Sequence, residues 1–284
     1  MLFGSHISTA GGVDKAFKLA ESLELEVMQI FTRNQNQWNP KPLAGDVISR
    51  FLSERDRTGI SPVFSHGSYL INLCSTDETT RERSELALQD ELMRCDLLEI
   101  PYLVLHPGSH MGQGENLGIE KVARAIDRVF SHLPDGNAML LLENTAGQGS
   151  NLGYRFEHLA EIRDQVGQKH RIGFCFDTCH AHAAGYDMLT EPACRGVFEQ
   201  VKQILGFENL KVFHFNDSVK PLGSRVDRHE HIGKGSLGTC VFGYLLRKRE
   251  FKNHPMALET PKSPDYHEDR ENLAVLKSLI SRKR

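Results

Sequence analysis

Residues that could bind metal ions recur along the chain, each directly after a short apolar run. Asp177 follows the run Gly173–Phe176, and His180 stands three residues further on. A run this short indicates a strand buried on both faces, so the carboxylate emerges where the strand ends. A buried carboxylate needs a partner, because an unpaired buried charge costs several kcal/mol. For this segment alone, a metal ion and a structural salt bridge are both suitable partners.

The same arrangement occurs in five other apolar runs. Their ends carry His66, His106, Glu143, His214 and Glu259. Any one of these residues alone is more simply interpreted as a satisfied polar residue. Six in six consecutive runs are not a coincidence, and if the runs converge, three imidazoles and three carboxylates lie within reach of each other. Three carboxylates would repel each other, and cations resolve that repulsion.

The donor types narrow the choice of metal. Imidazole with carboxylate suits zinc, and also manganese or iron, whereas magnesium prefers oxygen ligands alone. Adding His180, Asp227 and His229 gives five histidines and four carboxylates. Asp227 and His229 are two residues apart, which places both on one face of an extended segment. At three or four ligands per ion, with one bridging carboxylate, these groups support three ions. His182 and His231 are close alternatives that spacing alone does not rank.

Eight apolar runs alternate with segments whose apolar residues recur at helical spacing. The runs are 2–6, 27–31, 62–66, 102–106, 139–143, 173–177, 211–215 and 256–259. Such alternation implies a parallel sheet, and eight units imply a (β/α)₈ TIM barrel of the α/β class. Reactive groups of these barrels lie at the carboxyl ends of the strands. A doubly wound open sheet is the alternative, but it does not require eight equal units.

Composition and charge exclude other classes of protein. With 284 residues, 39% hydrophobic residues and no Ser- or Pro-rich linker, the chain 1–284 is expected to form a single domain. The net charge of −3 argues against generic binding of nucleic acid, so such contact needs a local basic patch. Six cysteines without a Cys-x-x-Cys pair are typical of a reduced compartment. Without a signal peptide or a long apolar run, we expect a cytoplasmic protein with no membrane contact.

Seven segments together resemble the endonuclease IV family of apurinic/apyrimidinic (AP) endonucleases. They follow in order over nearly the whole chain: Ser68–Leu73, His106–His110, Glu143–Gly149, Asp177–His180, His214–Ser218, Arg225–His229 and Leu258–Thr260. The resemblance implies a xylose-isomerase-like barrel with three zinc ions. It implies base excision repair of duplex DNA, acting with the chromosome. Such enzymes, also called deoxyribonuclease IV, cut on the 5′ side of abasic sites, leave 3′-hydroxyl and 5′-deoxyribose phosphate ends, and trim blocked 3′ ends.

The resemblance also assigns the metal ligands. The first zinc would be held by His66, His106 and Glu143. Glu143 would bridge to a second zinc, completed by Asp177, His214 and Glu259. The third zinc would be held by His180, Asp227 and His229. Two of the ions could hold a shared hydroxide as the nucleophile, oriented by Glu143 and Glu259 as catalytic carboxylates, and the third could stabilise the departing 3′ oxygen.

DNA would be contacted by loops at the same mouth of the barrel. The resemblance implies that Tyr69 enters the duplex at the lesion, whereas the alternative is a core tyrosine near the rim. The segment 33–38 resembles a second DNA-facing loop, with Arg33, Gln35 and Asn36 as its candidate contacts. Asn36 departs from the family, because members can carry an arginine there that enters the base stack.

Other basic residues have two interpretations. Arg225 and Arg228 could contact phosphates or form solvated salt bridges. The tail Arg282–Arg284 is interpreted as solvated. The expected partner is duplex DNA with abasic sites or blocked 3′ ends, bound by a monomer.

Two other functions use the same fold. A sugar isomerase would need a carboxylate-rich two-metal site and usually a lysine at a strand end. No lysine stands at the ends of these runs. A non-catalytic DNA- or metal-binding module is possible because fold does not determine function, but no ligand position is lost here. An amidohydrolase-type barrel would carry His-x-His on the first strand, where this chain has only His6.

Overall fold

Eight parallel strands close into a barrel, as the sequence predicts. The computed structural model describes residues 1–281, so the tail interpreted above lies outside the described residues. Around the barrel the strand order is β1-β10-β7-β6-β5-β4-β3-β2. The strands are β1 Leu2–His6, β2 Val27–Ile30, β3 Val63–His66, β4 Tyr102–Leu105, β5 Met139–Glu143, β6 Ile172–Asp177, β7 Leu210–His214 and β10 Pro255–Leu258. Pairing of β1 with β10, the first and last of these strands along the chain, closes the sheet.

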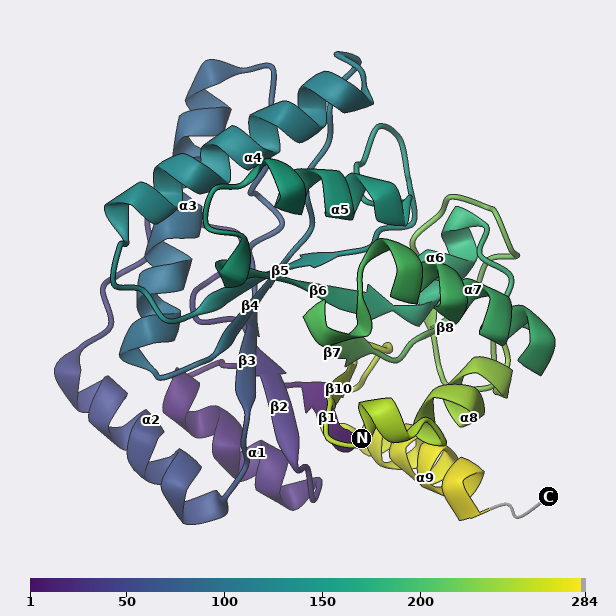
Figure 1. Cartoon of the computed structure of the whole chain (residues 1–284). Coiled ribbons are helices and arrows are strands. Elements are labelled where there is room, and N and C mark those ends of the chain that lie inside the picture. The colour runs from purple at the N-terminus through teal and green to yellow at the C-terminus, as the bar shows by residue number, and fades with distance from the viewer. Residues whose placement is uncertain (282–284) are drawn as a thin grey trace.

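Helices cover the outside of the barrel, with the strands at the centre (Figure 1). They are α1 Ala16–Ser22, α2 Gly45–Thr58, α3 Glu78–Leu97, α4 Glu115–His132, α5 Phe156–Gln165, α6 Thr178–Ala184, α7 Glu191–Ile204, α8 Cys240–Leu246 and α9 His267–Ser281. Short 3₁₀ helices precede four of the elements: η1 Val13–Lys15, η2 Lys169–Arg171, η3 Phe207–Asn209 and η4 Arg249–Phe251. Side-chain caps begin two long helices, because Asp77 accepts a hydrogen bond from the Thr80 amide and Thr190 accepts one from the Ala193 amide.

The apolar core has two layers. The larger layer lies between the strands and the helices, and the smaller one fills the barrel. The buried residues of the smaller layer are Val27, Phe64, Val104, Leu141, Cys175, Val212 and Ala257. Gly4 occupies the equivalent position on β1. An added Cβ there would stand 2.5 Å from the Val27 carbonyl oxygen, so the close approach of β1 and β2 leaves no room for a side chain.

Most strand boundaries differ from the predicted ones by about one residue. The strands expected to include His106 and Glu259 end one residue earlier, so both side chains start the following loops. The sequence did not predict α6, which begins directly after Asp177. Nor did it predict the small antiparallel sheet of β8 Asp217–Ser218 with β9 His229–Glu230.

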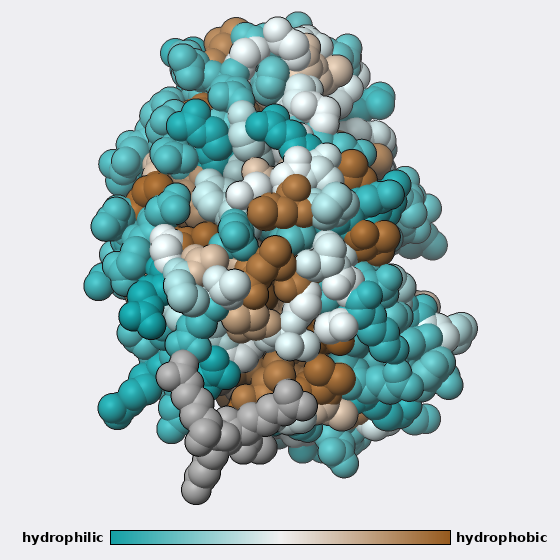
Figure 2. Space-filling view, turned by 90° about the vertical axis from the view of Figure 1, so that its right-hand side faces the viewer, coloured by the Kyte–Doolittle hydropathy of each residue, from teal (hydrophilic) through white to brown (hydrophobic). Residues whose placement is uncertain are grey.

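The outer surface is what amphipathic helices around a barrel should produce. Figure 2 shows one face, on which polar side chains surround smaller apolar areas. Among the described residues, no helix combines the length and apolar character needed to cross a bilayer.

Candidate metal centre

The barrel places one polar side chain per strand in a layer at its carboxyl-terminal end. Side chains alternate along a strand, so residues two positions after the interior apolar layer point into the barrel again. These residues are His6, Gln29, His66, His106, Glu143, Asp177, His214 and Glu259. Sequence reasoning identified six of them as site residues and missed His6 and Gln29. The period of two, counted from the interior apolar residues, is the signal that could have found both.

Glu143 lies at the centre of this layer and is fully buried. Its Oε2 is 3.2 Å from Nε2 of His66 and 3.1 Å from Nε2 of His106. Its Oε1 is 2.9 Å from Nδ1 of His214 and 3.1 Å from Nδ1 of His180. Imidazoles therefore surround both carboxylate oxygens, an arrangement in which one carboxylate can bridge two ions.

A second group of ligands surrounds His214. Its Nδ1 lies 3.3 Å from Oε2 of Glu259 and 3.8 Å from Oδ2 of Asp177. The amide of Asn216 donates to that Oδ2 at 2.7 Å, while Oδ1 accepts the backbone N–H of His180 at 2.7 Å. Asp177 is thus the N-cap of α6, and the helix it starts brings His180 back over the barrel mouth.

A third group combines α6 with a loop. Nε2 of His180 is 3.2 Å from Oδ2 of Asp227, and Nε2 of His229 is 3.3 Å from Oδ1 of the same carboxylate. Pairing of β8 with β9 sets Ser218 opposite His229 and so holds the loop over the barrel. Buried Asp217 fixes the next segment by accepting the N–H groups of Gly233 and Leu237 at 2.9 Å each.

Three ligand sets can be drawn from these contacts, and within each set the donor atoms all lie within 4.8 Å of one another. The sets are His66, His106 and Glu143; Glu143, Asp177, His214 and Glu259; and His180, Asp227 and His229. Imidazole with carboxylate is the donor chemistry of zinc, manganese and iron sites. The residues present therefore fit a group of divalent cations, and Glu143 is shared by two of the sets.

The electrostatics of the layer also indicate cations. Burial alone would raise the pKa of Glu143, but His214 and His106 lower that pKa well below its usual range. Burial likewise opposes the charge of His180, yet Asp177 and Asp227 raise the pKa of its imidazole well above its usual range. Without metal, the carboxylates thus draw protons onto the imidazoles, and bound cations would supply that positive charge instead.

In three of the histidines, a backbone carbonyl oxygen beside Nδ1 decides the tautomer. Nδ1 of His66 lies 2.7 Å from the carbonyl oxygen of Gly67. Nδ1 of His180 lies 3.0 Å from that of Asn144, and Nδ1 of His229 lies 3.2 Å from that of Glu259. A carbonyl oxygen only accepts, so each of these Nδ1 atoms carries a hydrogen, and each Nε2 would offer its lone pair to a bound cation. His214 is reversed, since its Nδ1 faces the carboxylates.

Two cysteines approach the same groups. Cys175 lies near Glu143 and His214, and Cys179 near Asp177 and His229. Burial raises the pKa of each thiol to about 12. Both are therefore neutral thiols, which suits the sequence interpretation of cysteines as small apolar fillers.

The two alternative histidines have other partners. Nε2 of His182 lies 3.1 Å from the hydroxyl of Ser236, and Nδ1 of His231 lies 3.2 Å from the amide nitrogen of Asn272. His182 thus links α6 to the segment at Ser236, and His231 links its loop to α9, which favours His180 and His229 as the ligands.

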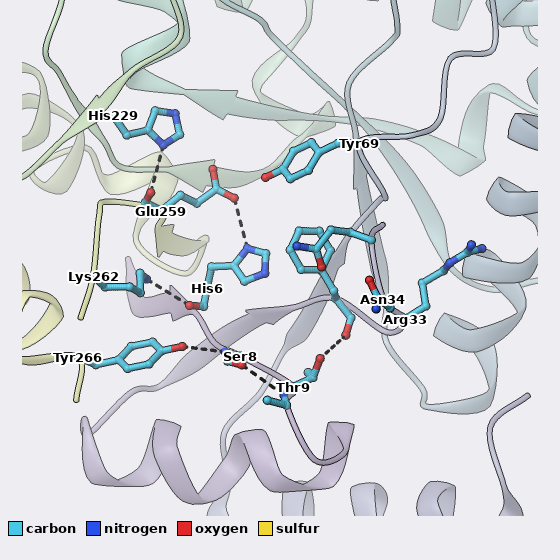
Figure 3. A pocket seen from close by; sticks show the side chains of 13 residues that line it. His6, Ser8, Thr9, Arg33, Asn34, Tyr69, His229, Glu259, Lys262 and Tyr266 are labelled. Atoms are coloured by element: carbon cyan, nitrogen blue, oxygen red, sulfur yellow. Dashed lines mark hydrogen bonds and ion pairs between the residues drawn. The ribbon is translucent and has the colours of Figure 1, made fainter. Parts of the chain in front are cut away.

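A cavity of about 670 Å³ opens beside the ligand layer. His229, Glu259 and His6 stand on one side of it, and Tyr69 points toward them from the opposite side (Figure 3). Tyr69 is 63% exposed, although its ring lies only 5.5 Å from that of His66. The alternative interpretation of Tyr69 as a core residue therefore does not match the structure, and its insertion into DNA stays a prediction.

Arg33 is placed differently from the sequence expectation of a DNA-facing side chain. Its side chain is 1% exposed, and the guanidinium points away from the cavity (Figure 3). It lies 3.3 Å from Asp90 and 3.9 Å from Glu91, both on α3, and donates to the backbone carbonyls of Gln37 and Trp38. Arg33 therefore holds the loop against the barrel, because acidic side chains of a helix distant in sequence attract it inward.

The other proposed DNA contacts lie on the outside. Asn36, Arg225 and Arg228 are exposed, and the Arg225 guanidinium stacks 4.3 Å above the ring of Tyr154. Gln35 is half-buried, and its carbonyl accepts a hydrogen bond from the Ser68 hydroxyl at 2.6 Å. This bond joins the loop at 33–38 to the segment that carries Tyr69.

A closed parallel barrel whose mouth gathers imidazoles and carboxylates that could hold metal ions defines the class of the protein as a TIM barrel with a candidate metal centre. Residues 17–279 match the family described as the xylose isomerase-like TIM barrel. A D-tagatose 3-epimerase-like protein shares this fold with a TM-score of 0.75 at 19% identity, covering 99% of this chain and 98% of the other. At that identity the likeness concerns the fold alone.

More similar proteins narrow the class. A probable endonuclease 4 of Chloroflexus aggregans is 50% identical over 278 residues, which cover 98% of this chain and 97% of that protein. The crystal structure of endonuclease IV from Thermus thermophilus matches with a TM-score of 0.88 and 35% identity over 99% of each chain. The chain belongs to the endonuclease IV family.

Proposed function

We propose that the protein is a zinc-dependent AP endonuclease of DNA repair. It would hydrolyse the phosphodiester on the 5′ side of an abasic site in duplex DNA, leaving 3′-hydroxyl and 5′-deoxyribose phosphate ends, and trim blocked 3′ ends. The observation that carries the proposal is the set of three ligand groups, two of which share Glu143, beside a cavity faced by exposed Tyr69. Membership of the endonuclease IV family supports DNA as the substrate.

The proposed cofactor is three zinc ions per chain, with manganese or iron as alternatives at one or more positions. The ligand groups described above would hold one ion each, with Glu143 shared. Divalent ions there would supply a nucleophile at neutral pH, neutralise charge on the phosphoryl oxygens and assist the leaving oxygen.

Protein groups would keep the reacting carboxylates in position. Glu259 is held at its backbone, where its N–H donates to Oδ1 of Asn216 at 2.8 Å. The same asparagine amide donates to Asp177, so one side chain orients two proposed ligands. Pre-positioned groups of this kind lower the reorganisation needed during reaction.

Recognition would depend on the lesion more than on charge. With a net charge of −3, the protein should bind intact duplex weakly. Tyr69 and the loop at 33–38 are joined through the Ser68–Gln35 bond, so they would meet the DNA as one surface. A duplex that already lacks a base costs less to bend and open, which favours binding at abasic sites.

Mapping the cut in a defined duplex tests this function. Light scattering first checks that the zinc-loaded protein is a monomer. The protein is then incubated with a duplex that carries one abasic site and a label on the 5′ or the 3′ end of the damaged strand. We expect a single cut on the 5′ side that leaves a 3′-hydroxyl, with Glu143→Gln inactive and intact duplex uncut. A cut on the 3′ side, or none by a protein that holds its metals, would contradict the proposal.

A further inference from the structure

Gln29 is a fully buried amide inside the apolar strand β2. Its carbonyl Oε1 lies 2.7 Å from Nε2 of His214. Its amide Nε2 lies 2.5 Å from Oε1 of Glu259 and 2.8 Å from Nδ1 of His6. The Gln29 side chain therefore contacts two proposed metal ligands, His214 and Glu259, and also His6, a histidine of the layer that is not a proposed ligand.

The chemistry of these partners determines the orientation of the amide. The carboxylate of Glu259 only accepts hydrogen bonds, so the NH₂ group of Gln29 must face it. The carbonyl of Gln29 must then face His214. Since a carbonyl cannot donate, Nε2 of His214 carries the hydrogen, and the lone pair on Nδ1 points toward Glu143, Asp177 and Glu259.

This tautomer needs support from the protein. The other tautomer of His214 would place its hydrogen on Nδ1, only 2.9 Å from Oε1 of Glu143, a favourable bond that would block the lone pair. Backbone carbonyls prevent the equivalent problem in His66, His180 and His229. In His214 the group that faces the remote nitrogen is the side chain of Gln29, which a single substitution can remove.

We propose that Gln29 is a positioning residue that holds His214 as its Nε2–H tautomer and orients Glu259. The ligand set of Glu143, Asp177, His214 and Glu259 is then preformed for its ion. The inference rests on the metal centre proposed above. Loss of a partner that orients a metal-ligating histidine typically weakens metal affinity by about 10–100-fold. Only one ion of the three depends on Gln29 in this way.

The test variant is Gln29→Met, which keeps the length of the side chain but removes its hydrogen bonds to His214 and Glu259. The matched control is Gln113→Met, because the amide of Gln113 donates to the Cys74 carbonyl outside the metal centre. Each zinc-loaded protein is titrated with a chelator while retained zinc is measured. We expect Gln29→Met to release one ion at an affinity about 10–100-fold weaker, with the other two ions retained. Gln113→Met should match the parent protein.

The tautomer is measured directly in the unmodified zinc-loaded protein by long-range ¹H–¹⁵N correlation of the histidine rings. We expect hydrogen on Nε2 of His214, in contrast with Nδ1 of His66, His180 and His229. Hydrogen on Nδ1 of His214 would overturn the inference. Unchanged zinc affinities at all three sites of Gln29→Met would overturn it as well. A parent protein that binds no zinc would instead overturn the metal centre itself, so the two failures are distinguishable.

Discussion

Nε2 of His180 lies 3.2 Å from Oδ2 of Asp227, a contact that joins a helix of the barrel to a loop outside it. The same carboxylate approaches His229, which belongs to the small sheet of β8 and β9. The other two ligand sets come from residues at the strand ends. The third set should therefore be separable from them by mutation.

His229→Ala tests whether the third set serves the leaving oxygen. A natural 3′ oxygen leaves poorly, whereas a nitrophenolate leaves without help. We expect turnover on abasic DNA to fall by roughly 10²–10³-fold, the scale for losing one electrostatic stabiliser. On a substrate with nitrophenolate in the leaving position, the loss should shrink toward unity. The measurement is the ratio of the two rates, after metal occupancy has been confirmed.

Glu143→Ala is the contrast in this experiment. Glu143 contacts imidazoles of several ligand sets, so its removal should disturb the nucleophile and slow both substrates alike. If His229→Ala also slows both equally, the third set positions the phosphate or the nucleophile, and its assignment to the leaving oxygen is wrong.

Metal content is the second prediction. Elemental analysis of purified protein, after loosely held metal has been removed, should give close to three ions per chain and mostly zinc, because three ligand sets are present. His182→Ala and His231→Ala are matched controls and should retain three, since these rings bind Ser236 and Asn272. A reproducible value near one in the parent protein would exclude the trinuclear centre.

Tyr69→Ala tests recognition of the lesion. Tyr69 is 63% exposed beside the cavity, so removal of its ring should not change metal content or fold. Aromatic stacking on a base contributes about 1–3 kcal/mol, so affinity for abasic duplex should fall by about 10–100-fold. Tyr69→Phe keeps the ring and should bind like the parent in the same titration. Equal affinity of the alanine variant would remove Tyr69 from the recognition surface.

Arg33→Met tests the structural role of this buried arginine. Its loss leaves Glu91 buried without the nearby guanidinium, and breaking a buried pair costs about 3–5 kcal/mol. Urea unfolding in the absence of DNA should show a decrease of that order in the free energy of unfolding. Asn36→Ala, in the same loop but exposed, should stay within about 0.5 kcal/mol of the parent. An unchanged free energy of unfolding for Arg33→Met would contradict this structural role.

The sequence by itself determined the barrel and most of the polar residues that gather at its mouth. Short apolar runs that end in histidine or carboxylate predict strands whose ends converge, because parallel strands of a closed sheet present their carboxyl ends at one mouth. Gln29 and His6 were missed for a local reason. Gln29 lies within the predicted run 27–31 and not at its end, and His6 alone suggested no metal motif.

Tertiary structure decided how individual side chains are used. Within its own loop Arg33 is indistinguishable from a surface cation, and only packing against Asp90 and Glu91 of α3 turns it inward. The tautomer of His214 depends on Gln29, 185 residues away in the chain. Local sequence specifies which residue ends a strand, but orientation and protonation follow from partners that only the closed barrel brings together.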